Sequence, residues 1–128
     1  MAGTVLADTL QDGAGNSTTM TNAIQGSAKA WVNFNGTSGS VAIRASYNVS
    51  SVTRSGTGTY SITFANAFVD TNYAAVMATR GSSGSGTPLL PLEHTSAGTR
   101  TTTNLPFYII ALNGVTPDAD LIEIAVFR

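Results

Sequence analysis

The sequence predicts an all-β protein: a jelly-roll-like antiparallel β-sandwich that forms a knob after an extended N-terminal arm. From Ala28 onward, apolar and polar residues alternate with a period of two. Turn signals divide this part into about seven or eight short strands at spacings of roughly ten residues. Only 10% of the 128 residues are charged, and Ser, Thr, Asn and 13 Gly take their place. This composition suits turns and sheet faces better than helices.

Residues 1–26 are predicted to form the arm, because they are poor in aromatic residues and rich in turn formers. Their apolar residues include two pairs spaced four apart, Leu6 with Leu10 and Met20 with Ile24. This spacing would place each pair on one side of a helical turn, but the stretches are too short for a stable isolated helix. We therefore expect an extended arm that anchors to another protein through these four residues. The alternative is a frayed terminus.

Residues 27–128 are predicted to form the knob. In AKAWVNFN (28–35), Ala30, Val32 and Phe34 share one strand face, and Trp31 lies on the other. In VAIRASYNV (41–49), every second residue is apolar, which predicts one inward face: Val41, Ile43, Ala45, Tyr47 and Val49. SVTRSGTGTY is a hairpin signal, and TYSITF and NYAAVMATR are further strands.

Two late segments, LPFYIIALN and LIEIAVF, are apolar on both strand faces. Such strands lie at the centre of a sheet that is covered on both sides, or at a contact between subunits. A sandwich also leaves sheet edges, which so few charges protect poorly. Closed self-association would cover them.

The composition argues against several classes of partner. No cluster of Lys and Arg is present to bind nucleic acid, and the net charge is −1. The N-terminus has no cationic and apolar secretory signal, and no apolar run approaches the roughly 20 residues that span a bilayer. With no Cys, disulfides and Cys-based metal sites are excluded. We expect no cofactor, no nucleic acid and no membrane insertion.

Candidate catalytic groups are sparse, and we expect no enzyme activity. The single His, His94, lies beside Glu93, and a loop or interface role suits it better than catalysis. Asp118, Asp120 and Glu123 could bind Ca²⁺, but a polar turn before a strand also explains them, and no EF-hand pattern is present. GSSGSG lacks the Lys-Ser/Thr of a phosphate loop.

Four motifs resemble the C-terminal knob domains of bacteriophage tail-fibre and related virion proteins, especially those of marine and cyanobacterial phages. They are, in order, AKAWVNFNG (28–36), IRASYNVSS (43–51), GTGTYSITF (56–64) and FVDTNY (68–73). The preceding LADTLQDGAGNSTTMTNAIQGS resembles the lead-in to such domains, so the likeness covers roughly residues 4 to 80. A tail fibre usually carries a long stem before this domain, whereas here the knob begins close to Met1 and makes up nearly the whole chain.

The resemblance implies a homotrimeric structural protein of the virion. It would be a short fibre or a capsid decoration (cement or head-fibre) protein, held to capsid or tail proteins by residues 1–26. We expect four residues to pack at the subunit contacts: Trp31, Phe34, Phe107 and Ile109. The alternative is the receptor-binding tip of a tail fibre that recognises host surface glycan through loops 81–87 and 94–104, or through Trp31 as a sugar platform.

Overall fold

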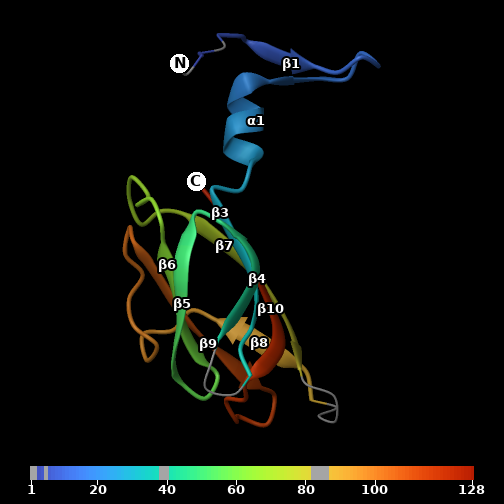
Figure 1. The fold of residues 1–128 in the computed structure, drawn as a ribbon. Helices are drawn as coiled ribbons and strands as arrows, with labels where there is room; N and C mark the ends of the chain where they lie inside the picture. Colours follow the sequence, from blue (N-terminus) through green and yellow to red (C-terminus); the bar gives the residue numbers. More distant parts are fainter. Residues whose placement is uncertain (1–2, 5, 38–40, 82–86) are drawn as a thin grey trace.

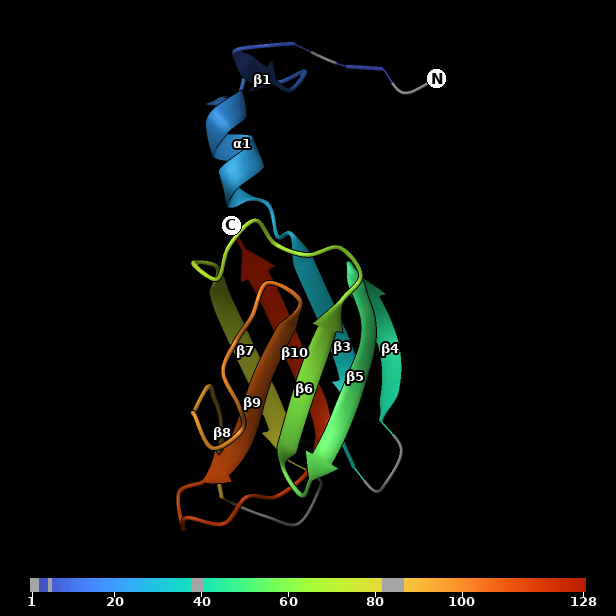
Figure 2. The same ribbon diagram turned by 90° about the vertical axis from the view of Figure 1, so that its left-hand side faces the viewer.

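A computed structural model, which describes residues 3–4, 6–37, 41–81 and 87–128, shows two antiparallel four-stranded sheets packed face to face (Figures 1 and 2). The predicted all-β sandwich is thus confirmed. The elements are β1 (Thr9–Gln11), β2 (Ser17–Thr19), α1 (Met20–Gly26), β3 (Ala30–Asn35), β4 (Ala42–Tyr47), β5 (Val49–Gly56), β6 (Thr59–Phe64), β7 (Ala74–Gly81), β8 (Leu89–Leu92), β9 (Asn104–Ala111) and β10 (Ala119–Phe127).

One sheet has the order β4-β3-β10-β7 and the other β5-β6-β9-β8. Their eight strands equal the number in a jelly roll. Three consecutive pairs, β3–β4, β5–β6 and β8–β9, are hairpins within one sheet, so the likeness to a jelly roll is limited to the strand number. The two segments that are apolar on both faces became β9 and β10, each at the centre of its sheet.

The chain passes from one sheet to the other at Asn48, between β4 and β5. Asn48 has a φ of 54°, a left-handed conformation that Asn tolerates better than most residues. Its side chain donates to the carbonyl of Lys29 (3.1 Å) and accepts from the backbone N–H of Asn66 (2.7 Å). These bonds fix the corner that closes one side of the sandwich.

Aromatic rings fill the interior. Phe34 of β3 lies edge-on to Tyr60 of β6 and Phe107 of β9, at ring-centroid distances of 5.6 and 6.4 Å, and so joins the two sheets. Nearer the arm, Phe68 and Tyr73 pack against Phe64 at 4.7 and 5.8 Å. The core is therefore complete within a single chain.

This core corrects three of the four predicted subunit contacts. The side chains of Phe34, Phe107 and Ile109 are fully buried between the two sheets of their own chain. They have no surface left for a neighbour, so their hydrophobicity serves intrachain packing. Trp31 differs, because it points away from the core and stays 40% exposed.

The predicted inward face of residues 41–49 is wrong, because a β-bulge interrupts the alternation. The β3–β4 register shifts by one residue between Asn33 and Phe34, so that Arg44 is the additional residue in β4. Ile43 is opposite the buried Phe34, whereas Tyr47 is opposite the outward Trp31. Strict alternation would have placed Ile43 and Tyr47 on the same face, and the bulge separates them.

The arm is more structured than predicted. A short hairpin, β1–β2, leads into α1, which stands beyond the end of the sandwich where β3 begins and β10 ends (Figures 1 and 2). Asp12 closes the hairpin turn by accepting from the backbone N–H groups of Ala14 and Asn16, and Thr19 caps α1 by accepting from Asn22 N–H (3.1 Å). Local capping replaces the expected extended conformation. In the described part of the chain, no helix has the length and hydropathy to cross a membrane.

Candidate functional site

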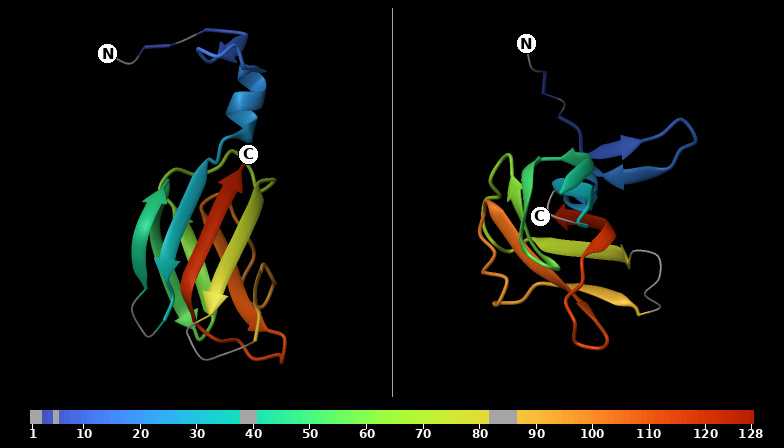
Figure 3. Two further views of the ribbon diagram at one scale, coloured as in Figure 1. Left: turned by 90° about the vertical axis from the view of Figure 1, so that its right-hand side faces the viewer. Right: turned by 60° about the horizontal axis from the view of Figure 1, so that its bottom comes forward.

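The candidate functional site is the outward side of the β4-β3-β10-β7 sheet, which the left view of Figure 3 presents to the reader. Strand register aligns two rows of side chains across it. The first row is Tyr47, Trp31, Ala125 and Val76, and the second is Ala45, Asn33, Glu123 and Ala78. We call these eight residues the Trp31 face.

The first row is apolar and open to solvent. Tyr47 is 58% exposed, Trp31 40% and Val76 63%, while the smaller Ala125 lies between the last two. Adjacent exposed side chains of this size form one continuous apolar surface rather than scattered single residues. Such a surface is typical of a site that binds a protein or another ligand.

The second row is held by side-chain hydrogen bonds. The amide of Asn33 donates to the carboxylate of Glu123 (2.8 Å), and Arg44 donates to the amide oxygen of Asn33 (3.3 Å). Arg44 also donates to the backbone carbonyl of Asp120 (2.7 Å). The polar groups of this face therefore satisfy one another within the chain.

A shallow groove of about 490 Å³ lies between the two rows. Trp31 and Val76 line it along the first row, and the small side chain of Ala125 leaves room between them. Ala45 and Ala78 leave room along the second row. The groove can accept an apolar side chain or the face of a sugar ring. It has no acid–base pair arranged for chemistry, since Glu123 is already bonded to Asn33.

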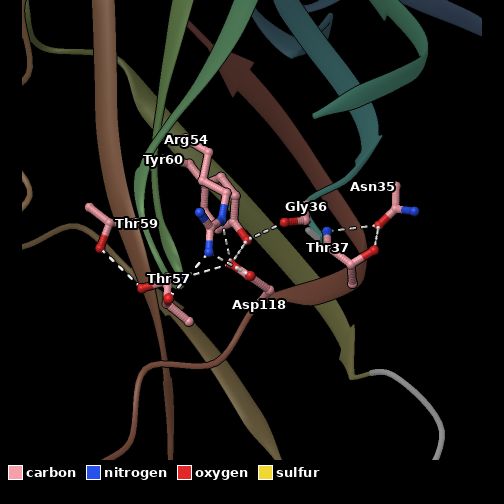
Figure 4. Close-up of polar contacts among 9 residues, drawn as sticks. Asn35, Gly36, Thr37, Arg54, Thr57, Thr59, Tyr60 and Asp118 are labelled. Atoms are coloured by element: carbon pink, nitrogen blue, oxygen red, sulfur yellow. Dashed lines mark hydrogen bonds and ion pairs between the residues drawn. The ribbon is translucent and has the colours of Figure 1, made fainter. Parts of the chain in front are cut away.

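The predicted acidic group at the start of β10 separates into three different environments. Asp118 accepts from Arg54 Nε (2.9 Å), Tyr60 Oη (2.7 Å) and the backbone N–H of Gly58 (2.8 Å). We call these four residues the Asp118 cluster (Figure 4). Asp120 pairs with Arg80 at 3.2 Å, and Glu123 lies on the Trp31 face. Among the described residues, no three side chains of the types that ligate metals come together.

The Asp118 cluster joins the β5–β6 turn to the start of β10. Gly58, in that turn, has a φ of +66°, and a Cβ there would lie 2.7 Å from the carbonyl oxygen of Pro117, so the approach requires glycine. Tyr60 Oη also lies 3.0 Å from the carbonyl of Gly36, which follows β3. The cluster therefore connects both sheets at the end opposite the arm.

Electrostatics keep Asp118 ionised. Partial burial acts to raise the pKa of Asp118, but the donors from Arg54, Gly58 and Tyr60 outweigh it and hold the pKa below its ordinary value. Burial, followed by the nearby Asp118 carboxylate, raises the pKa of Tyr60 above that of a free tyrosine. Tyr60 is thus a neutral donor and Asp118 a charged acceptor across the neutral range, which suits a structural cluster.

His94 lies in an exposed turn after β8. Its Nδ1 accepts from the backbone N–H of Ser96 (3.1 Å), and its carbonyl accepts from Ala97 N–H (2.9 Å). The imidazole packs edge-on against Tyr108, with the ring centroids 5.6 Å apart. These contacts account for His94 as a turn residue. Of the loops predicted to contact glycan, residues 82–86 lie outside the described residues.

The four predicted anchoring residues occupy different elements of the arm. Leu10 is in β1, Met20 and Ile24 are in α1, and Leu6 precedes the hairpin. Leu6 is 94% and Ile24 57% exposed, whereas Met20 is partly buried. The Met20–Ile24 pair thus lies on a helix, while the Leu6–Leu10 pair does not.

Sequence reasoning placed Trp31 on the strand face opposite Val32 and Phe34, but it missed Tyr47 and Val76 as its neighbours on that side of the sheet. The signal for Val76 was the two-sided hydrophobicity of its neighbour β10, whereas nothing in the sequence marked the bulge that turns Tyr47 outward.

Comparison of the chain with models of protein families, with curated proteins and with solved structures gives no match.

Proposed function

We propose that the chain is a structural protein of a bacteriophage virion: a short trimeric fibre or a capsid decoration protein that residues 1–26 hold to capsid or tail proteins. The four sequence motifs support the phage context. The observation that carries the attachment mechanism is the arm itself, since its apolar residues Leu6, Leu10 and Ile24 are exposed. An exposed apolar arm gains stability by burying these side chains against a partner.

The arm is joined to the knob in a way that leaves it free to bind elsewhere. Among the described residues, the hydrogen bonds between the two are those that Ser27 Oγ (3.0 Å) and Lys29 Nζ donate to the carbonyl of Ile24, both at the junction itself. The core of the knob is complete without the arm. If three arms are linked in one trimer, each bound arm raises the effective concentration of the other two at the particle.

Deletion of residues 2–25 is expected to leave a soluble, folded trimer that no longer joins particles. The reason is that the deletion removes the arm's exposed apolar residues and leaves the core of the knob intact. Incorporation into particles, assayed by co-sedimentation with purified virions, checks this. A deleted protein that still co-sediments would contradict the anchoring role.

Point variants sharpen the same test. Leu10→Asp with Ile24→Asp places charge on the exposed apolar residues, and Gln11→Asp with Gln25→Asp adds the same charge at neighbouring exposed positions. We expect loss of incorporation in the first double variant and retention in the second. The copy number per particle then distinguishes the two virion roles: hundreds indicate the capsid shell, and a few tens or fewer indicate tail or vertex fibres.

A second candidate function is a receptor-binding tip that recognises host glycan. The observation that favours it is the exposed indole of Trp31 beside the amide and carboxylate of Asn33 and Glu123 in the groove. Sugar rings stack on such indoles while amides and carboxylates bind their hydroxyls. A glycan array probed with the whole chain tests it, and a signal that Trp31→Ala abolishes would support it.

A further inference from the structure

We propose that the Trp31 face is the surface through which copies of this chain assemble. The proposal deepens the trimer that the proposed function includes, and it rests on that part of it. It assigns the subunit contact to the outward side of the β4-β3-β10-β7 sheet and to Tyr47, Trp31 and Val76. Phe34, Phe107 and Ile109, which pack inside the knob, have no part in it.

Strand β10 provides the first evidence that the outward side of the sheet is covered. It lies at the centre of its sheet, and its inward residues Ile122, Ile124 and Val126 are buried in the core. Its outward residues are Leu121, Glu123, Ala125 and Phe127, of which three are apolar. Apolar residues on both faces are typical of a central strand that is covered on both sides. No described segment of the chain lies over the outward side (Figure 3), and the proposal assigns its cover to another copy of the chain.

The β5–β6 half of the opposite sheet has a polar outward side. The outward residues of β5 and β6 pair as Ser51 with Thr63 and Thr53 with Ser61. Hydroxyl groups cover that region, whereas Tyr47, Trp31, Ala125 and Val76 cover the corresponding row of the Trp31 face. The contrast holds for the β5–β6 half of that sheet, since its β8–β9 half carries the exposed apolar residues Leu90 and Leu92.

The charges on and beside the Trp31 face allow several copies of this face to pack against one another. Arg44 and Arg80 balance Asp120 and Glu123, so two copies would not repel one another. Arg80 pairs with Asp120, Glu123 accepts from Asn33, and Arg44 donates to the Asp120 carbonyl. Covering this face therefore leaves none of these groups without a partner. The same bonds occupy the groups that a sugar would need, which favours a protein over a glycan.

The size of the face suits a subunit contact. Four strands about 4.8 Å apart make it roughly 19 Å wide, and strands of 6 to 9 residues make it roughly 20–30 Å long at about 3.3 Å per residue. In projection it covers roughly 400–600 Å², to which the relief of the side chains adds accessible area. Stable interfaces bury roughly 600–1,000 Å² per partner.

The face also contains both halves of a contact, which points to a second copy as its occupant. Tyr47 projects from the edge strand β4, and the groove with its small alanine side chains lies on the same sheet. A copy can therefore insert its Tyr47 into a neighbour's groove. The face reaches the end of the sandwich from which α1 extends, so assembled knobs would present their arms at the same end (Figure 3).

Val76→Arg and Tyr47→Arg test the assignment on the purified chain, without particles. Both side chains are largely exposed in one chain, so the fold tolerates the change, while a buried Arg in the contact disfavours assembly. By sedimentation equilibrium we expect an oligomer for the wild type, and a dissociation constant at least ~30-fold higher for each variant. Thr53→Arg and Thr63→Arg, on the hydroxyl-covered sheet, are the matched controls and should assemble as the wild type does.

The only Trp of the chain reports the contact directly. Dilution of the wild type should shift Trp31 emission to the red at the concentration where sedimentation shows dissociation, and Val76→Arg should show the red-shifted emission at all concentrations. Trp31→Ala should assemble less tightly and melt at a lower temperature. A monomeric wild type in dilute and concentrated solution, or face variants that assemble as the controls do, would overturn the proposal, and so would a glycan bound at Trp31 by a monomer.

Failure here is distinguishable from failure of the virion role. A wild type that is monomeric yet joins particles through its arm would refute the assembly surface and keep the anchoring. A wild type that assembles through the Trp31 face but never joins particles would refute the anchoring and keep the assembly surface.

Discussion

Replacement of Phe107 by Ala is expected to lower the free energy of unfolding by about 3–5 kcal/mol, the largest effect of any single change considered. Phe107 is fully buried, with its ring stacked on Tyr60 at 5.5 Å and edge-on to Phe34 at 6.4 Å. Its removal leaves a cavity between the two sheets that these rigid neighbours cannot fill. Denaturant unfolding followed by circular dichroism measures the loss.

Tyr108→Ala is the matched control for this prediction, because Tyr108 is the next residue of β9 and points to the outward side. We expect it to cost about 1 kcal/mol or less. If Phe107→Ala does not fold, Phe107→Leu, with an expected loss of about 1–2 kcal/mol, replaces it.

The same variant separates core packing from subunit contact. In a Val76→Arg background, which is expected to be monomeric, Phe107→Ala should lower stability by the same amount as in the wild type. A loss confined to the wild-type background would mean that Phe107 acts between subunits, against its full burial in one chain.

How far the sequence predicts this structure depends on whether a pattern is local. The alternation in AKAWVNFN placed Val32 and Phe34 on one strand face and Trp31 on the other, because alternation along a strand is a property of the backbone, and the structure shows that the first face is the buried one. The β5–β6 hairpin followed in the same way from its glycines. The Thr19 cap and the Asp12 turn were also local, although only the structure shows that they fold the arm.

Non-local features escaped prediction for a physical reason. The segment that became β9 is apolar on both faces, and sequence alone cannot tell whether its own chain or a neighbour covers Phe107 and Ile109. The bulge at Arg44 exists only in the register between β3 and β4. Arg54 and Asp118 are 64 residues apart in the chain, so their contact depends on the completed fold.

That contact gives the second large effect: Asp118→Asn is expected to cost about 2–3 kcal/mol at pH 7. The amide keeps the shape of the carboxylate, but it has one acceptor oxygen in place of two and its NH₂ faces donors from Arg54, Gly58 or Tyr60. The figure is below that for a fully buried pair, because the side chains of Arg54 and Asp118 are 22% and 17% exposed and solvent screens them. Asp120→Asn, in the more exposed pair with Arg80, should change stability by about 0.5 kcal/mol or less.

The dependence of this loss on pH identifies its cause. The pKa of Asp118 is lower in the folded than in the unfolded chain, so its contribution to stability is complete above the unfolded pKa of about 3.9 and is lost as the pH falls through the folded pKa. The difference in stability between the wild type and Asp118→Asn should therefore be constant from pH 7 to about 5 and shrink below about 4. Asp12 and Asp70 also have lowered pKa values, but they are present in both proteins and cancel in the difference. A difference that stays constant down to pH 2 would show that Asn disturbs packing rather than charge, and the Asp118 cluster would then connect the sheets by shape and not by its ion pair.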